Sequence, residues 1–552
     1  MSVRNGFVLL ITLSSLTFLV ACGSNGTGII NPTAPPSGSF SNSNLNGSYV
    51  FSVSGLDQSQ FPYVAVGAFT ANGSGGISGG SVDINDTGFT SGSIANAPLS
   101  GSSNYTVGLD GRGTATLTFQ NSSNNPFSSS NSITLKFVLQ DSFHGLVIEY
   151  DGNATGSGTI DQQTTGVTPT GTYAFLLSGN SFSSGGPLAL AGNFAVGSGG
   201  ALTGLEDFNE GGVTAYAGQT LTGTLAVGPS STPSTTISNP LTAAPSQTYD
   251  VYVIDASHMK IIEMDNFATM SGDAYAQTPA TLPATASTMA FTLFGNNASG
   301  VEALGGFIVT DGNFNITNSS SEDFNTNSQV STAAGPFTGT YAAGGTGRYT
   351  LAFPSGSSFV GGTAYAAYPS SGGVLLLEID TGGITAGAAY PQTAGAAFAA
   401  SQGYGLNLTG ANISSSGSFE VDDVAEFTAN SNGTITGVLN ENYAPGGVIS
   451  GDLAFTTSSS SITAGSGGRY VLSTPIANGN NTTLETGFNL TFYAVDGTMF
   501  PFIEIDGSQP AVGMIIEQNA SATTPLSVTG HGSMYVPRPM VVPHNLKEVK
   551  QK

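Results

Sequence analysis

The chain has 552 residues, of which only 8% are charged, and its 34 acidic and 10 basic residues give a formal net charge of −24. This balance excludes nucleic acid as an expected partner, because phosphate binding needs a basic face. A hydrophobic content of 39% argues against a disordered chain. We interpret the acidity as a source of solubility on an exposed surface.

The N-terminal segment is predicted to direct export. Arg4 precedes an apolar run from Phe7 to Val20, which is shorter than the ~20 apolar residues needed to span a membrane. A charged start, a short apolar stretch and a small residue before the cleavage point are typical of a secretory signal. Residues 1–21 are therefore predicted to be a signal peptide.

The end of this segment, Leu19-Val20-Ala21-Cys22, resembles the lipobox of bacterial lipoproteins. The resemblance implies that the Cys22 thiol is lipidated, that the chain is cut before it, and that the new amine is acylated. Cys22 is the only cysteine, so it has no disulfide partner. Two or more acyl chains anchor a protein stably. We expect an exported protein held by Cys22 on a bacterial membrane, at the outer membrane or cell surface.

Two segments of different composition flank the middle of the chain. Residues 22–44 are rich in Gly, Ser, Asn, Thr and Pro, which is typical of a flexible tether. Residues 521–552 hold four of the ten basic residues and several prolines, and they predict an irregular tail.

An internal repeat organises everything between these segments. Its pattern is Glu-x-Asp, then Gly seven residues after the Asp, then Gln five residues further on, and it occurs four times. The successive glutamates are 114, 115 and 126 residues apart. The four copies are Glu149, Asp151, Gly158 and Gln163; Glu263, Asp265, Gly272 and Gln277; Glu378, Asp380, Gly387 and Gln392; Glu504, Asp506, Gly513 and Gln518. The predicted repeat units are residues 45–165, 166–280, 281–395 and 396–520.

Each unit is predicted to be an all-β domain. Alternating apolar and polar residues, bounded by Gly, Asn and Asp, indicate about eight short antiparallel strands per unit. An up-and-down barrel or a two-sheet sandwich would leave few exposed strand edges. The rival fold, a propeller with two blades per unit, needs a half-period repeat that the sequence lacks. The opening Gly-x-Tyr strand of two units faintly resembles the start of lipocalin- or avidin-like barrels.

The repeated Glu-x-Asp carries two alternative interpretations. Both carboxylates lie on one face of a strand, where like charges need compensation. One source is an ion pair with the arginine of a Gly-Arg step within the same unit. These arginines are Arg112, Arg348 and Arg469. The other is calcium, which takes carboxylate and amide oxygens; Asp83-Ile84-Asn85 superficially resembles the opening of a calcium loop, although the acid that closes an EF-hand loop is absent.

No catalytic constellation is evident, and we expect a protein that is not an enzyme. The four histidines do not follow the repeat, although His144 and His258 occupy equivalent positions. Paired carboxylates also hydrolyse glycosides, but a motif copied four times is typical of architecture. The predicted function is a membrane-anchored surface lipoprotein with a structural, adhesive or ligand-binding role. The alternative is a calcium-dependent or carbohydrate-binding or carbohydrate-active surface protein that uses the Glu-x-Asp strands.

Overall fold

A computed structural model describes most of the chain between residues 33 and 524. The described residues are 33–88, 93–120, 131–211, 214–226, 237–239, 247–326, 329–414, 417–445, 447–448, 451–477, 483–507 and 509–524. The predicted signal peptide, Cys22 and most of the predicted C-terminal tail lie outside these residues. Within the described part, no helix is long and apolar enough to cross a membrane.

The all-β prediction is confirmed, with one antiparallel sheet for each repeat. Unit 1 contains η1 (Asn42–Asn44), β1 (Asn46–Leu56), β2 (Pro62–Asn72), β3 (Ile77–Asp86), β4 (Ser93–Pro98), β5 (Asn104–Val107), β6 (Arg112–Thr118), β7 (Ser132–Leu139), β8 (His144–Tyr150) and β9 (Thr155–Gln162). Unit 2 contains β10 (Gly171–Ser181), β11 (Pro187–Val196), η3 (Ser198–Gly200), β12 (Ala201–Glu210), β13 (Thr214–Thr224), β14 (Ile237–Asn239), β15 (Gln247–Val253), β16 (His258–Glu263) and β17 (Ala268–Ala276).

The second half of the chain repeats this plan. Unit 3 contains β18 (Ser287–Asn297), β19 (Gly300–Thr310), β20 (Asn315–Thr326), β21 (Gln329–Gly345), β22 (Arg348–Ala352), β23 (Ala364–Ser370), β24 (Gly373–Glu378) and β25 (Gly383–Pro391). Unit 4 contains β26 (Gln402–Ser414), β27 (Gly417–Ala429), β28 (Ile435–Ala444), β29 (Gly447–Val448), β30 (Leu453–Phe455), η4 (Thr457–Ser459), β31 (Ser461–Ala464), η5 (Ser466–Gly468), β32 (Arg469–Ala477), β33 (Thr483–Tyr493), β34 (Met499–Glu504) and β35 (Ala511–Glu517).

Each unit is an up-and-down antiparallel sheet that curls into a barrel or half-barrel, and its first strand also pairs with its last. These closing pairs are β1–β9, β10–β17, β18–β25 and β26–β35. Unit 3 is a closed barrel of eight strands, and in unit 4 the pairing of β27 with β28 closes the path. In unit 1 the gap between the outermost strands carries the isolated bridges Gly76–Asn104 and Leu99–Phe119.

Local sequence explains both the strands and their turns. In β6, Gly113, Ala115 and Leu117 are buried while the residues between them are half-buried, as period-two alternation requires. Several turns use glycines with a positive φ, such as Gly73 (φ 74°) between β2 and β3, a conformation that other residues rarely adopt. The inward residues fill each barrel, so each unit has its own apolar core.

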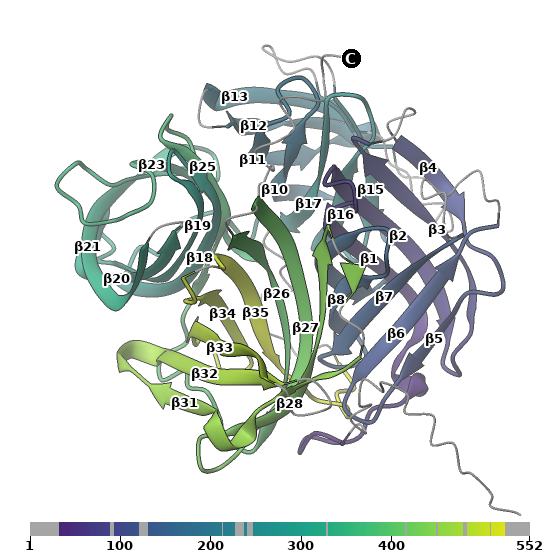
Figure 1. The fold of residues 1–552 in the computed structure, drawn as a ribbon. Helices are drawn as coiled ribbons and strands as arrows, with labels where there is room; N and C mark the ends of the chain where they lie inside the picture. Colours follow the sequence, from purple (N-terminus) through teal and green to yellow (C-terminus); the bar gives the residue numbers. More distant parts are fainter. Residues whose placement is uncertain are drawn as a thin grey trace, which may run out of the picture.

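The four units form a closed ring around a common centre (Figure 1). The first strands of each unit pack against the last strands of the next one: β2 and β3 on β15–β17, β10–β12 on β23–β25, and β18–β20 on β33–β35. Strands β26–β28 of unit 4 then pack on β7–β9 of unit 1, which closes the circle. We call these four contacts joints 1–2, 2–3, 3–4 and 4–1.

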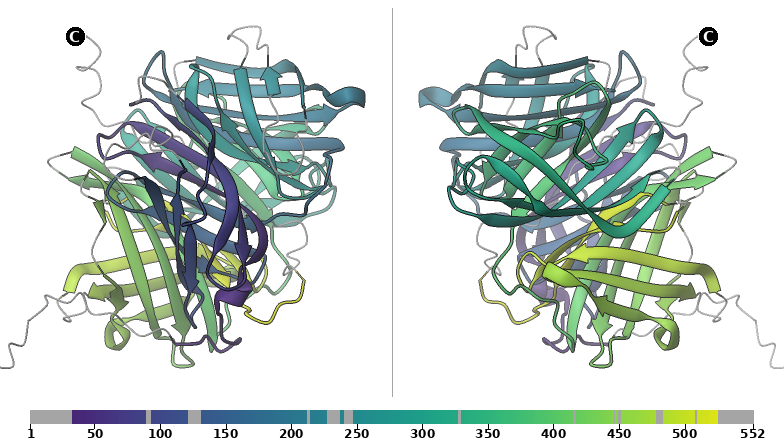
Figure 2. Two further views of the ribbon diagram at one scale, coloured as in Figure 1. Left: turned by 90° about the vertical axis from the view of Figure 1, so that its right-hand side faces the viewer. Right: turned by 90° about the vertical axis from the view of Figure 1, so that its left-hand side faces the viewer.

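An apolar core at the centre binds the ring together. It contains buried residues from all four units, among them Leu146, Leu176, Leu377 and Met514. Side views show four units in one body, with none standing apart (Figure 2). The repeats are therefore four domains of a single compact assembly, rather than independent beads.

The two ends of the described chain meet at joint 4–1. Phe40 is fully buried in the core of unit 1, and its backbone N–H donates to the Leu109 carbonyl at 3.1 Å. The Asn44 side chain donates to the Ala520 carbonyl at 3.1 Å. Residues 33–44 were expected to belong to a flexible tether, but this part packs against units 1 and 4, because its few apolar side chains find buried sites there.

Candidate functional site

An Asp-x-Asn pair recurs in the first three units, and Asn440 and Asn442 stand at the same place in unit 4. The pairs are Asp83 and Asn85, Asp207 and Asn209, and Asp323 and Asn325. The asparagine that ends each pair reaches into the next unit. In every joint, its side-chain amide donates to backbone carbonyls around the Glu-x-Asp hairpin of that unit. The shortest of these contacts are Asn85 to Glu263 O at 2.8 Å, Asn209 to Glu378 O at 2.9 Å, Asn325 to Asp506 O at 2.7 Å and Asn442 to Glu149 O at 2.8 Å. All four asparagines are fully buried. The last contact joins unit 4 to unit 1 and repeats the bonding of the other three joints.

The strand geometry explains this placement. Asp83 and Asn85 lie two residues apart on β3, so both face the neighbouring unit, while Ile84 between them points into the core of unit 1. The amide of Asn85 satisfies the carbonyls of Glu263 and Ala268, at 2.8 and 2.9 Å, which a buried hairpin end would otherwise leave without donors.

The glutamine that ends the repeat forms a second clamp in each joint. Its side-chain N–H donates to a backbone carbonyl of the following unit. These bonds are Gln163 to Val253 O at 2.7 Å, Gln277 to Gly347 O at 2.7 Å, Gln392 to Ala494 O at 2.8 Å and Gln518 to Asp110 O at 2.9 Å. Within each unit, the Glu-x-Asp hairpin therefore contacts the preceding unit, and the Gln contacts the following unit.

In two joints, an arginine pairs with the aspartate of the Asp-x-Asn pair of the preceding unit. Arg348 binds Asp207 through two bonds of 2.7 and 2.6 Å, and Arg469 binds Asp323 through two bonds of 2.8 Å. The hydroxyl of Tyr368 donates to Asp207 and that of Tyr493 to Asp323. Each planar guanidinium therefore meets a carboxylate in the fork geometry that favours arginine over lysine.

The remaining two joints depart from this pattern. At joint 4–1, Asn440 stands where the aspartate would be, and Arg112 binds Asp452 of unit 4 at 3.0 Å and Asp110 at 2.8 Å. At joint 1–2, Asp83 accepts from the Tyr252 hydroxyl at 2.7 Å and from the backbone N–H of Asn96. Burial raises the pKa of Asp83, and the charge of Asp250 adds to the rise.

The aspartate of Glu-x-Asp fixes a hairpin. In every unit it accepts a bond from the backbone N–H of a residue 17 positions earlier, on the neighbouring strand. These donors are Thr134 for Asp151 (2.9 Å), Thr248 for Asp265 (2.7 Å), Thr363 for Asp380 and Asn489 for Asp506 (2.8 Å). Asp151 and Asp265 also bind a backbone N–H two residues further on. This use of the carboxylate is structural.

The glutamate of Glu-x-Asp is buried in every unit. Burial raises the pKa of Glu263 to about 11, with Asp265 adding to the shift, and burial raises the pKa of Glu378 to about 8. Burial also raises the pKa of Glu149 well above its ordinary value, with the charge of Asp151 adding to the rise. Burial therefore favours the protonated, uncharged form of these three glutamates, which attracts a cation less than a carboxylate would.

The prediction that these arginines form ion pairs with the Glu-x-Asp acids of their own unit is wrong. Arg348 and Arg469 pair with aspartates of the preceding unit, and Arg112 pairs with Asp110 and Asp452, so the arginine is an interface residue. The reason is that the Gly-Arg step lies on the side of its unit that packs against the preceding unit. Among the described residues, no group of three or more His, Cys, Asp or Glu side chains is arranged to hold a metal ion.

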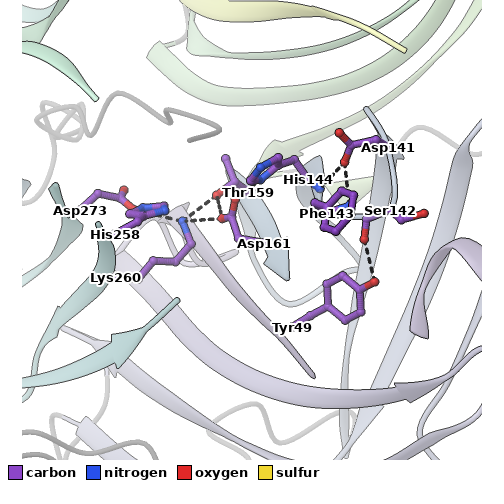
Figure 3. A network of polar contacts seen from close by, with 10 residues as sticks. All are labelled: Tyr49, Asp141, Ser142, Phe143, His144, Thr159, Asp161, His258, Lys260 and Asp273. Atoms are coloured by element: carbon purple, nitrogen blue, oxygen red, sulfur yellow. Dashed lines mark hydrogen bonds and ion pairs between the residues drawn. The ribbon is translucent and has the colours of Figure 1, made fainter. Parts of the chain in front are cut away.

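A chain of buried charged residues crosses joint 1–2 (Figure 3). Lys260, on β16, is fully buried and lies 3.2 Å from Asp161 of unit 1 and 3.1 Å from Asp273 of unit 2. Its ammonium also donates to the Thr159 hydroxyl at 2.6 Å. His144 binds Asp161 at 3.0 Å on one side, and His258 binds Asp273 at 2.7 Å on the other. The lysine thus has three acceptors and each aspartate has a histidine.

The acidic residues are mostly internal. Twenty aspartates and glutamates are buried, and every charged side chain whose burial the structure describes is buried or half-buried. The interpretation of the acidity as a soluble exposed surface is therefore wrong for the described part of the chain. The carboxyls lie at hairpin ends and in joints, where backbone N–H groups, tyrosine hydroxyls and a few bases bind them.

Sequence reasoning identified these residues as landmarks but missed their role. The final Gln keeps a constant spacing from Glu-x-Asp, and the Asp-x-Asn pair recurs at the same place in the order of strands. This recurrence was the available signal of a shared interface. The lipidation candidate, Cys22, lies outside the described residues. Comparison of the chain with protein-family models and with curated protein sequences finds no match.

Proposed function

We propose that the chain is an exported lipoprotein, anchored through Cys22, whose four β units form one rigid, non-enzymatic scaffold at the cell surface. The observation that carries the scaffold role is the closed ring. All four copies of the repeated polar motif are used to hold one unit to the next. A motif committed to internal contacts in every copy supports an architectural role.

The barrels themselves support this choice over a ligand carrier. Cavities inside the barrels of units 2 and 3 have volumes of about 20 and 10 Å³, room for a single water molecule. Their linings are mainly large apolar side chains, such as Phe175 and Phe194 in unit 2 and Met289 and Tyr341 in unit 3. A lipocalin-like calyx would instead need several hundred cubic ångströms for a small ligand.

The geometry also favours a scaffold over the calcium-dependent or carbohydrate-active alternative. The Glu-x-Asp glutamates Glu149, Glu263 and Glu378 are buried with raised pKa values. Their aspartate neighbours Asp151 and Asp265 already bind backbone N–H groups. The glutamate of each pair is sealed from solvent, unlike a general acid or base that must reach its substrate.

The neutral surface defines what such a scaffold presents. With charges confined to buried and half-buried positions, exposed strands and turns present hydroxyl, amide and small side chains, as in residues 317–319 (TNS) and 463–467 (TAGSG). We therefore propose adhesive or structural contacts through neutral hydrogen bonding, which salt screens less than contacts between charges.

Membrane anchoring is tested by the Cys22→Ala substitution. The wild-type chain is expected to incorporate radiolabelled palmitate and to fractionate with membranes, whereas C22A loses the label and is recovered in the soluble exported fraction. Ser24→Ala is the matched control and retains both properties. A wild-type chain that takes up no fatty acid would contradict the anchor, although the ring would stand.

A further inference from the structure

Lys260 is a buried lysine at a position where the repeat otherwise has apolar residues. Three residues before the Glu-x-Asp glutamate, the other units have Leu146, Leu375 and Pro501. The Lys260 side chain is fully buried at joint 1–2, between Asp161 of unit 1 and Asp273 of its own unit (Figure 3). A buried ion pair is often no more stabilising than well-packed apolar side chains of similar volume. Packing alone therefore does not account for a lysine at this position.

The two carboxyls that contact Lys260 have different surroundings. In Asp161, each oxygen has its own donor: the Thr159 hydroxyl donates to Oδ2 at 2.8 Å, and His144 Nδ1 lies 3.0 Å from Oδ1. In Asp273, Oδ1 alone contacts both the lysine, at 3.1 Å, and His258 Nε2, at 2.7 Å. An ionised carboxylate only accepts hydrogen bonds, so both ring nitrogens donate.

The Thr159 hydroxyl connects the lysine nitrogen to the carboxyl of the other unit. Its Oγ1 accepts from Lys260 Nζ at 2.6 Å and donates to Oδ2 of Asp161 at 2.8 Å. Nζ itself lies 3.2 Å from that Oδ2, one bond away from the carboxyl carbon. The site thus brings together an amine, a carboxyl carbon, a proton relay and a second carboxylate beside the amine.

We propose that Lys260 and Asp161 condense to an amide, which joins unit 2 covalently to unit 1. The nitrogen of Lys260 is the nucleophile, Asp161 supplies the carbonyl carbon, and Asp273 is the base. The proposal does not rest on membrane anchoring or on the scaffold function. It adds a covalent bond to a joint that hydrogen bonds and apolar contacts hold in the same way as the other three.

The reaction starts from an ion pair. Burial lowers the pKa of Lys260, but the charges of Asp273 and Asp161 outweigh it, so the net shift is upward. Burial raises the pKa of Asp161, but the charge of Lys260 and the hydrogen bond of His144 outweigh it, so the net shift is downward. An ammonium has no lone pair with which to attack, so a proton must move within the site before the bond forms.

The protons balance among the residues of the site. The Thr159 hydroxyl passes one proton from the ammonium to Oδ2 of Asp161, and the freed lone pair of Nζ attacks Cγ. The His144 N–H stabilises the negative charge that develops on Oδ1. Asp273 takes a second proton from the nitrogen. The Cγ–Oδ2 bond breaks as the carbonyl re-forms, and the departing hydroxide takes the proton from Asp273. One ammonium and one carboxylate thus yield one amide and one water.

The buried position of the site favours condensation over hydrolysis. Lys260 and Asp161 are both fully buried, and Tyr275 covers His258 with ring centroids 4.4 Å apart. Amide formation removes one positive and one negative charge from the interior, where their desolvation is costly. The packed joint also holds the reacting groups in contact, which replaces the encounter of two separate molecules. The step releases water and consumes no other reactant.

The intact mass of residues 22–552, produced without lipid and measured under denaturing conditions, tests the proposal. The wild-type chain is expected to be lighter than its sequence mass by one water, about 18 Da. Trypsin does not cut after an amidated lysine, so residues 137–348 should remain in one peptide. Fragmentation of this peptide is expected to place the link between Lys260 and Asp161.

Lys260→Arg removes the nucleophile and keeps the positive charge, since a guanidinium stays protonated. This variant is expected to have its full sequence mass. Lys136→Arg, which changes a half-buried lysine outside the joint, is the matched control and keeps the loss of water. In Asp273→Asn, which lacks the base, the linked fraction after a fixed time is expected to fall about tenfold or more.

A wild-type chain of full sequence mass would overturn the proposal and leave Lys260 in an ordinary ion pair. A loss of water that persists in Lys260→Arg would also overturn it, because an Asp-Gly step such as Asp311-Gly312 can lose water by closing a succinimide. A link from Lys260 to Asp273 would refute the covalent bond between units. An Asp273→Asn chain that links as fast as the wild type would refute the role of Asp273 as the base.

Discussion

At the scale of single residues, each joint depends on an asparagine whose side chain replaces a missing strand. The carbonyls at the end of a Glu-x-Asp hairpin have no neighbouring strand within their own unit, and the amide of the preceding unit satisfies them. Removing that amide leaves buried acceptors without a donor, which costs more than the lost bond alone. A neutral side chain at this position keeps the contact independent of pH and salt.

Asn209→Ala is therefore expected to lower the free energy of unfolding by about 2–4 kcal/mol, because two buried carbonyls, of Glu378 and Gly383, lose their donor. Asn432→Ala, at an exposed turn position, is the matched control and changes it by less than about 1 kcal/mol. Urea denaturation followed by tyrosine fluorescence measures both. Equal effects of the two substitutions would show that Asn209 is an ordinary surface residue.

At the scale of the strand and hairpin, β8, β16, β24 and β34 each carry a buried glutamate at or next to their last position, and an aspartate two residues later fixes the turn. The sequence pattern predicted that the two acids lie at the end of a strand. It did not predict that the glutamate is buried while the aspartate binds backbone N–H groups. Period-two alternation can be recognised in a short stretch of sequence, whereas the protonation of a buried glutamate depends on which residues of the preceding unit cover it. For Glu263 that covering residue is Asn85, 178 positions away.

Glu378→Gln tests this assignment through pH. Glu378 accepts a bond from Thr385 at 2.8 Å and its pKa is raised to about 8 by burial. The folded wild type then holds a proton that the unfolded chain releases above its ordinary pKa of 4.5, so wild-type stability falls as the pH rises from 4.5 to 8. The glutamine variant lacks this titration and shows a shallower decline.

Thermal unfolding between pH 4.5 and pH 8.5 provides the comparison, with Glu210→Gln as the control that keeps the wild-type slope. The melting temperatures of E378Q and the wild type should be closest at the acid end and diverge towards pH 8 in favour of E378Q. Parallel curves would mean that Glu378 is ionised in the folded protein.

At the scale of the whole molecule, the chain is one ring whose first and last units meet as any other neighbours do. The strands, the four-fold repeat and the all-β class could be predicted, since each depends on patterns within about 115 residues, whereas the choice between a barrel and a sandwich stayed open. The ring could not, because a repeated motif does not show whether it binds its own unit or the next one. The closing contact, from Asn442 to Glu149, spans 293 residues. Composition was misleading for a similar reason, because the number of acidic residues does not show whether their carboxyls are buried or exposed.

Small-angle X-ray scattering of the mature, unlipidated chain measures the closed ring most directly. A compact body of this length is expected to have a radius of gyration of about 25 Å, whereas four separate domains in a line would give about 40 Å. The ring predicts the smaller radius of gyration. The double substitution Gln518→Ala and Asn442→Ala, which removes both side-chain contacts of joint 4–1, is expected to increase it. A wild-type radius near that of the extended string would contradict the closed ring.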